Sequence, residues 1–262
     1  MTPSNPSAAA IRGHLIAGYS DPAALHGYRT LGLFPAEARL VDAHFPPGGT
    51  VLDLGCGTGR TSIPLWKLGF RVHAVDITPA MIAAARAVAA RYRADLALHV
   101  QDAQELAFPD ASFDGALFSY NGIGHLPRRA GKLAALREIR RVLRPGAAFV
   151  FSVHHLCCRS REARLWRRQL LPWALAHLLR LRRRDRELGE LFDDSMLDLR
   201  YLHVLPARTY RRLLRAAGFE VELMAAASTV ERRRPAGRLA RLFRDDDYTY
   251  FVARRPPAAV TR

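Results

Sequence analysis

The sequence is poor in cysteine and has no long hydrophobic run. Its three cysteines, Cys56, Cys157 and Cys158, form neither a disulfide framework nor a metal-ligand spacing, and the adjacent pair is interpreted as packing rather than as a redox device. The apolar stretch 170–179 has ten residues, whereas a bilayer span needs about 20. Residues 1–15 lack a basic segment followed by an apolar core, so no signal peptide is expected. A disulfide-stapled secreted protein and an integral membrane protein are thereby excluded, and the cytoplasm is the expected location.

Lysine is also scarce, although the chain is strongly basic. Of 40 Lys and Arg residues only Lys67 and Lys132 are lysine, and against 24 acidic residues they give a net charge of +16. Such a charge is compatible with a nucleic acid or an anionic membrane as partner. An arginine bias beside abundant alanine, leucine and proline also follows from genome composition. The charge alone therefore assigns no partner.

Short apolar segments alternate with helical patterns through the first 155 residues. Expected strands are 50–56, 71–77, 96–103, 113–121 and 147–155, and expected helices are 59–69, 78–93 and 131–146. Thr78 is expected to cap the second of these helices, with Pro79 at its first position. Repeated strand–helix–strand units of this length predict an α/β fold, with a parallel sheet and helices on both faces.

The pattern changes after residue 156. Ten arginines lie between residues 159 and 186, in a region with helical spacing that is predicted to break into two helices at Pro172. An extended piece, a helix ending at Gly218 and a strand follow. A last strand is expected within 245–256, and the two final strands are expected to pair antiparallel at the sheet edge.

A glycine-rich turn follows the first predicted strand. Residues 51–60, VLDLGCGTGR, place Gly55, Gly57 and Gly59 behind Asp53. Glycine admits positive φ and lets a ligand lie against the backbone. The dinucleotide pattern G-x-G-x-x-G would need glycine where Arg60 stands, and a P-loop would need Gly-Lys-Ser/Thr. A tight turn without ligand is the structural alternative.

Two further acids end the next two predicted strands. Asp76 is placed to accept hydrogen bonds from both hydroxyls of a ribose lying across the strand ends. Asp102, followed by Ala103, stands where an adenine amino group would be expected. Each acid read alone is also compatible with a helix cap. Three acids after three consecutive strands favour a nucleoside-containing ligand.

Together with this loop, the segments AVDITPAMIAAAR, QDAQELAFPDASFDGALFSYNGIGHL, LRPGAAFVFSVHH and LLRAAGFEVE resemble the class I S-adenosylmethionine-dependent methyltransferases of small-molecule type. The resemblance covers residues 40–155 and 205–254. It implies a Rossmann-like seven-stranded sheet of order 3-2-1-4-5-7-6 with strand 7 antiparallel, and S-adenosylmethionine as cofactor. The residues it implies around the cofactor are Asp53, Gly55, Gly57 and Gly59 at the methionine part, Asp76 at the ribose, Ile77 and Met81 beside the adenine, Asp102 and Ala103 at its edge, Ser119 and Tyr120 at the sulfonium, and Tyr19 with Tyr28 in a closing N-terminal helix.

The resemblance also implies a single methyltransferase domain. Its expected parts are an N-terminal helical cap (1–45), a cofactor-binding core (46–155), a basic helical lid over the acceptor (156–204), the C-terminal part of the core (205–254) and a tail (255–262). An anionic membrane surface or lipid-like acceptor, and RNA, are the alternatives for the basic segment.

Methyl transfer needs alignment and exclusion of water, and a general base helps a hydroxyl or protonated amine acceptor. The candidates are His154, His125 and His155, with His154 preferred because Ser152 gives its strand face some polarity. Structural histidines are the alternative for each. The predicted function is methylation of a small-molecule acceptor. An RNA methyltransferase and a catalytically inactive cofactor-binding protein are the alternatives.

Overall fold

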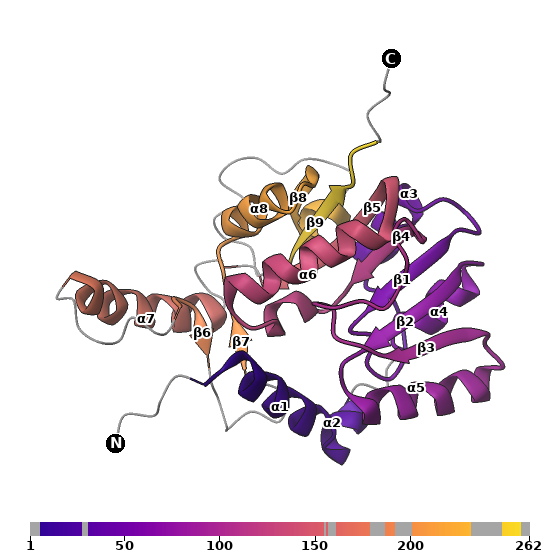
Figure 1. The fold of residues 1–262 in the computed structure, drawn as a ribbon, viewed down its shortest axis with the longest axis horizontal. Coiled ribbons are helices and arrows are strands. Elements are labelled where there is room, and N and C mark those ends of the chain that lie inside the picture. Colours follow the sequence, from indigo (N-terminus) through magenta and orange to yellow (C-terminus); the bar gives the residue numbers. More distant parts are fainter. Residues whose placement is uncertain are drawn as a thin grey trace.

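The protein is built around one twisted sheet. The computed structural model describes residues 6–27, 31–154, 156, 161–178, 187–191, 201–231 and 248–257. In this part of the chain seven strands form the order β3-β2-β1-β4-β5-β9-β8 (Figure 1). They are β1 (Thr50–Leu54), β2 (Arg71–Asp76), β3 (Leu96–Val100), β4 (Phe113–Phe118), β5 (Leu143–His154), β8 (Glu220–Ala226) and β9 (Tyr248–Arg254). All neighbours pair in parallel except β9, which runs antiparallel to β5 and β8. The predicted strand order and the antiparallel strand are confirmed.

Helices cover both faces of the sheet, because successive side chains of a buried strand point to opposite faces. Leu52 and Leu54 pack in one core cluster with α6 (Arg128–Val142) and α8 (Ala207–Ala216). Val51 packs in a second cluster, on the opposite face. The helices on that face are α3 (Pro35–His44), α4 (Ser62–Lys67), α5 (Pro79–Tyr92) and the short α9 (Ala227–Glu231). Near the N-terminus, α1 (Ala8–Tyr19) and α2 (Pro22–Gly27) pack against α5.

The strands end earlier than expected, at the points where the backbone enters loops. After β4 the chain turns through Tyr120 and Asn121, both at positive φ, into the short 3-10 helix η1 (Gly122–His125). The helix predicted over 131–146 ends at Val142, because Leu143 already pairs with β4. Thr78 is the N-cap residue of α5 by position, but its side chain makes no capping hydrogen bond. The Thr78 amide donates to Asp76 (2.8 Å), so the predicted cap position is confirmed, but the side chain of Thr78 does not make the capping bond.

The predicted break at Pro172 was also wrong, since α7 (Arg161–Leu178) runs through it as one helix. Pro172 is exposed, so the carbonyl that loses its helical hydrogen bond can be satisfied by water, and the helix tolerates the proline. The rest of the predicted lid helices, 159–160 and 179–184, lies outside the described residues.

Two short strands, β6 (Glu190–Leu191) and β7 (Leu202–His203), form an antiparallel hairpin beside α7. Nowhere in the described ranges is there a helix with the length and apolar character that a membrane span requires.

Candidate active site

A cavity opens at the carboxyl ends of β1, β2 and β4, beneath α1. It encloses about 1030 Å³, counting the part open to solvent. The strand order reverses at β1, where β2 lies on one side and β4 on the other, and open α/β sheets bind ligands at such a point. Its lining includes the predicted residues Tyr19, Gly55, Gly57, Asp76, Ile77, Met81, Asp102, Ala103, Ser119, Tyr120 and His125.

The glycines of the loop have different roles. Gly55 has φ +59°, and a Cβ on it would lie 2.8 Å from a ring carbon of Phe118, so this position is closed to any side chain by packing. Gly57 has φ +54° and lines the cavity, where a Cβ would find only the Met81 sulfur within 4 Å. Gly59 is not among the lining residues, and its amide donates to the Cys56 carbonyl (3.0 Å), closing the turn. The expected ligand contact from Gly59 is therefore replaced by a turn-forming role.

Asp53 is fully buried and does not line the cavity, contrary to the prediction. It shares a strand face with Val51, beneath α4, and its carboxylate accepts hydrogen bonds from the Thr61 hydroxyl (2.7 and 2.9 Å) and the Ser62 hydroxyl (2.6 Å). Burial raises its pKa to about 6, against the opposing effect of these hydroxyls. Asp53 therefore anchors the helix that follows the glycine loop.

Asp76, at the end of β2 and predicted to hold the ribose, bonds to the glycine loop. One carboxylate oxygen accepts the Gly57 amide (3.0 Å) and the other accepts the Thr78 amide (2.8 Å). Burial raises its pKa, and these two amides oppose the rise. An ionised carboxylate has about four acceptor positions, so two amide bonds leave capacity for a ligand hydroxyl.

Asp102 joins the cavity to the N-terminal helix. Its carboxylate accepts the guanidinium of Arg12 (2.9 Å), which lies on α1, and the amide of Gln104 (2.9 Å). No local sequence pattern signals Arg12, because its partner is 90 residues away in the chain. The ion pair brings α1 over the cavity, where Tyr19 at its end also lines the wall.

A buried ion pair supports the wall at Ser119. Glu37 of α3 is fully buried and accepts hydrogen bonds from Ser119 and from Arg60. The Arg60 guanidinium lies over the Phe34 ring, 4.6 Å from its centroid, and Tyr120 stacks on Phe34 at 5.7 Å. Of these residues in the wall, only Arg60 and the predicted Ser119 and Tyr120 stand out in the sequence. Arg60 does so because it occupies the position where the dinucleotide pattern needs glycine.

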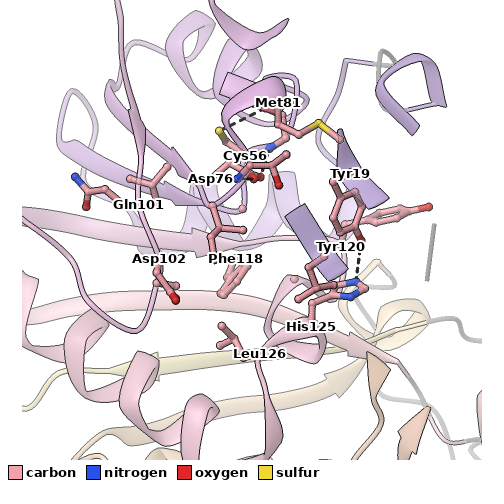
Figure 2. A pocket seen from close by; sticks show the side chains of 18 of the residues that line it. Tyr19, Cys56, Asp76, Met81, Gln101, Asp102, Phe118, Tyr120, His125 and Leu126 are labelled. Carbon is pink, nitrogen blue, oxygen red and sulfur yellow. Dashed lines mark hydrogen bonds between the residues drawn. The ribbon is translucent and has the colours of Figure 1, made fainter. Parts of the chain in front are cut away.

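His125 and Tyr19 face each other at one end of the cavity, away from Gln101 and Asp102 at the other end (Figure 2). The His125 Nδ1 lies 2.9 Å from the Tyr201 carbonyl, which only accepts, so Nδ1 carries the proton. Its Nε2 therefore accepts from the Tyr19 hydroxyl (3.2 Å). Burial lowers the pKa of His125 to about 4, so the ring is neutral at pH 7.

His154, the preferred base, is not among the residues that line the cavity. It follows Ser152 on the strand face that meets α3, and its ring stacks on Tyr248 at 5.5 Å between centroids. The preference failed because the polarity of Ser152 serves a backbone contact, the Asn121 amide at 3.2 Å. His155 and Tyr28 lie outside the described residues.

A buried polar group holds the His125 loop from behind. Lys132 is fully buried and donates to the carbonyls of Leu126 (2.7 Å) and Gly124 (3.3 Å). Burial lowers its pKa to about 7, opposed by Glu187 and Glu190. Glu190 of β6 also accepts from the Tyr201 hydroxyl (3.1 Å), so the β6–β7 hairpin fixes the carbonyl that orients His125.

The core of the chain is similar in sequence to known methyltransferases. A model of the methyltransferase domain family matches residues 51–146. The chain is 38% identical over 111 residues to 2-methyl-6-phytyl-1,4-hydroquinone methyltransferase of Synechocystis sp. and 42% identical over 110 residues to aklanonic acid methyltransferase of Streptomyces sp.. Each alignment covers 40% of this chain, and they cover 32% and 50% of those proteins, so the chain spans half or less of the length of these relatives.

The fold agrees over a longer stretch. A crystal structure of a SAM-dependent methyltransferase from Methanosarcina mazei superposes with a TM-score of 0.62 at 20% identity, over 87% of this chain and all of that one. Residues 51–146 therefore match the methyltransferase domain family, and the sheet around them has the fold of this SAM-dependent methyltransferase.

Proposed function

We propose that this chain transfers a methyl group from S-adenosylmethionine to a small-molecule acceptor. The observation that carries the proposal is one cavity that joins the glycine loop and Asp76 to the Tyr19–His125 pair. The names of the two relatives support the acceptor class, since they give a hydroquinone and an organic acid.

The residues of the cavity fit the cofactor. Gly57 leaves open space where any side chain would project, and the half-buried Asp76 carboxylate keeps acceptor positions for ribose hydroxyls. Met81 and Ile77 offer an apolar surface to a flat base, beside the Asp102 carboxylate. Ser119 and Tyr120 line the same cavity as His125. The bound cofactor supplies a methyl carbon already activated by positive sulfur.

The protein then has to align the acceptor and remove its proton. Tyr19 and His125 both reach the cavity, and the Nε2 lone pair of His125 is held by the fixed Nδ1–H contact to Tyr201. An acceptor hydroxyl that displaces Tyr19 from Nε2 would be held by the same lone pair. A base with a pKa near 4 is weak, but a hydroxyl becomes strongly acidic as its oxygen gains a methyl group. His125 therefore suits late proton removal.

The cofactor site is tested by calorimetric titration with S-adenosylmethionine and its demethylated product. Gly57→Ala is expected to weaken binding at least about tenfold, because the new methyl group enters the cavity. Gly48→Ala is the matched control, since Gly48 also has positive φ (+70°) and open space but lies away from the cavity. Equal affinity in both variants, or no binding by the unmodified protein, would contradict the proposal.

The transfer itself is tested by formation of the demethylated product with hydroquinone, phenol and carboxylic acid acceptors, and with RNA. Turnover with RNA alone would favour an RNA methyltransferase. Binding without turnover on every acceptor would favour a cofactor-binding protein that has lost catalysis.

A further inference from the structure

One stripe of α7 is exposed along its whole length and changes character halfway. Arg164, Arg168, Leu171, Leu175 and Leu178 recur at spacings of four and three residues, which places them on one side of the helix. All five are exposed, with exposed fractions of 67%, 47% and 78% for the three leucines in turn. The stripe is therefore basic in its first half and apolar in its second.

The opposite side of α7 holds the helix to the protein. Ala163 is buried, and Trp166, Gln169 and Trp173 are half-buried. The Gln169 amide donates to the Glu190 carbonyl of β6 (3.3 Å). Figure 1 shows α7 at the left edge of the molecule, extending away from the seven-stranded sheet. The leucine stripe thus lies on a protruding element, on the side away from the contacts that α7 makes with the described residues.

We infer that this stripe of α7 docks on an anionic lipid bilayer. An interfacial helix of this kind lies in the membrane plane, with its leucines in the acyl boundary and its arginines among the anionic headgroups. Arg167, exposed and next to the stripe, adds a third cation. Glu162 is the one acid in the sequence of α7, and the whole chain carries a net charge of +16. Charge and apolar surface therefore point to the same partner.

Two other occupants fit the stripe less well. RNA would be held by the arginines through phosphate contacts, and three exposed leucines add nothing to such contacts. In a pair of antiparallel copies, the basic half of one stripe would cover the apolar half of the other, burying arginines against leucines. The docking does not depend on the proposed methyl transfer, and it is measured without cofactor or acceptor.

The test is co-sedimentation of the full chain with phosphatidylcholine vesicles, with and without phosphatidylglycerol. Binding is expected only with the anionic lipid, and it should weaken as salt rises. Leu171→Gln with Leu178→Gln is expected to reduce binding about tenfold or more without changing the charge. Leu68→Gln with Val100→Gln is the matched control, since these residues are 57% and 48% exposed elsewhere on the surface.

A second set of variants tests the contribution of the arginines. Replacing Arg164, Arg167 and Arg168 by Gln is expected to reduce binding about tenfold or more, whereas Gln at the exposed α8 arginines, Arg211, Arg212 and Arg215, should leave most of it. Far-ultraviolet circular dichroism checks that each variant is folded. Equal binding to neutral vesicles, equal losses in the control sets, RNA binding without vesicle binding, or dimerisation that the leucine variant abolishes would overturn the inference.

Discussion

His203 is expected to lower the stability of the protein in mild acid. Its side chain on β7 is fully buried, and burial lowers its pKa from 6.5 to about 2, helped by the charges of Lys132, Arg129 and Arg128 and opposed by the Leu188 carbonyl. The unfolded chain binds a proton near pH 6.5 and the folded chain does not, so the stability that neutral His203 contributes is fully present above pH 6.5 and is lost as pH falls. Between pH 7 and pH 5 the free energy of unfolding should fall by about 2 kcal/mol from this residue alone.

Any pKa of His203 below about 4 in the folded protein gives the same loss of unfolding free energy between pH 7 and pH 5. His203→Gln keeps an amide donor for the Leu188 carbonyl, which accepts from His203 Nε2 at 3.3 Å, and removes the titration. Urea unfolding, followed by tryptophan fluorescence at pH 7 and pH 5, should show the loss in the variant smaller by about 2 kcal/mol. His14→Gln, at an exposed position on α1, should leave the loss unchanged. An equal loss in wild type and His203→Gln would refute the reasoning.

Three further changes probe the site. Asp53→Asn should stabilise the fold at pH 8 by up to about 3 kcal/mol in urea unfolding, because burial raises the Asp53 pKa and penalises the ionised form. Cofactor affinity by calorimetry should stay within about threefold, and a larger loss would mean direct contact. Arg12→Gln should speed amide hydrogen exchange across α1 by between about 1.5-fold and fivefold, as expected for a partly exposed ion pair to Asp102; unchanged exchange would show that the pair does not hold the helix. His125→Ala should lower kcat about 10²-fold with cofactor affinity retained, while His154→Ala should not; the reverse order would restore His154 as the base.

Much of the fold was predictable because its signals are local. Apolar segments of strand length, glycine at the first turn and acids after three strands each occupy a few consecutive residues. The failure at Pro172 arose because the rule that proline breaks a helix takes no account of solvent: Pro172 lies inside α7 but is exposed, so water can satisfy the carbonyl that it leaves without a helical partner. The hairpin of β6 and β7 has two residues in each strand, too few for a periodic pattern.

Residues of the site could be predicted where their position along the backbone places them at the cavity. They could not be predicted where the direction of the side chain determines whether they reach it. Gly57 and Asp76 follow from the ends of two strands. The sequence prediction placed Asp53 at the cofactor. Alternation along β1 instead puts Asp53 on the same strand face as the buried Val51, away from the cavity. The Glu37–Arg60 pair and the contact of His125 with Tyr201 join residues 23 and 76 positions apart, and no local pattern signals either.

The antiparallel β9 has a consequence for how the protein is made. It is the last described strand in the chain, yet it lies between β5 and β8. A ribosome that has released everything up to residue 247 has therefore delivered six strands that cannot close into one sheet, with β5 presenting an open edge along its length. Folding of the nascent chain should remain incomplete until residues 248–254 emerge. A stop codon shortly before them would produce an aggregation-prone chain rather than a slightly shortened protein.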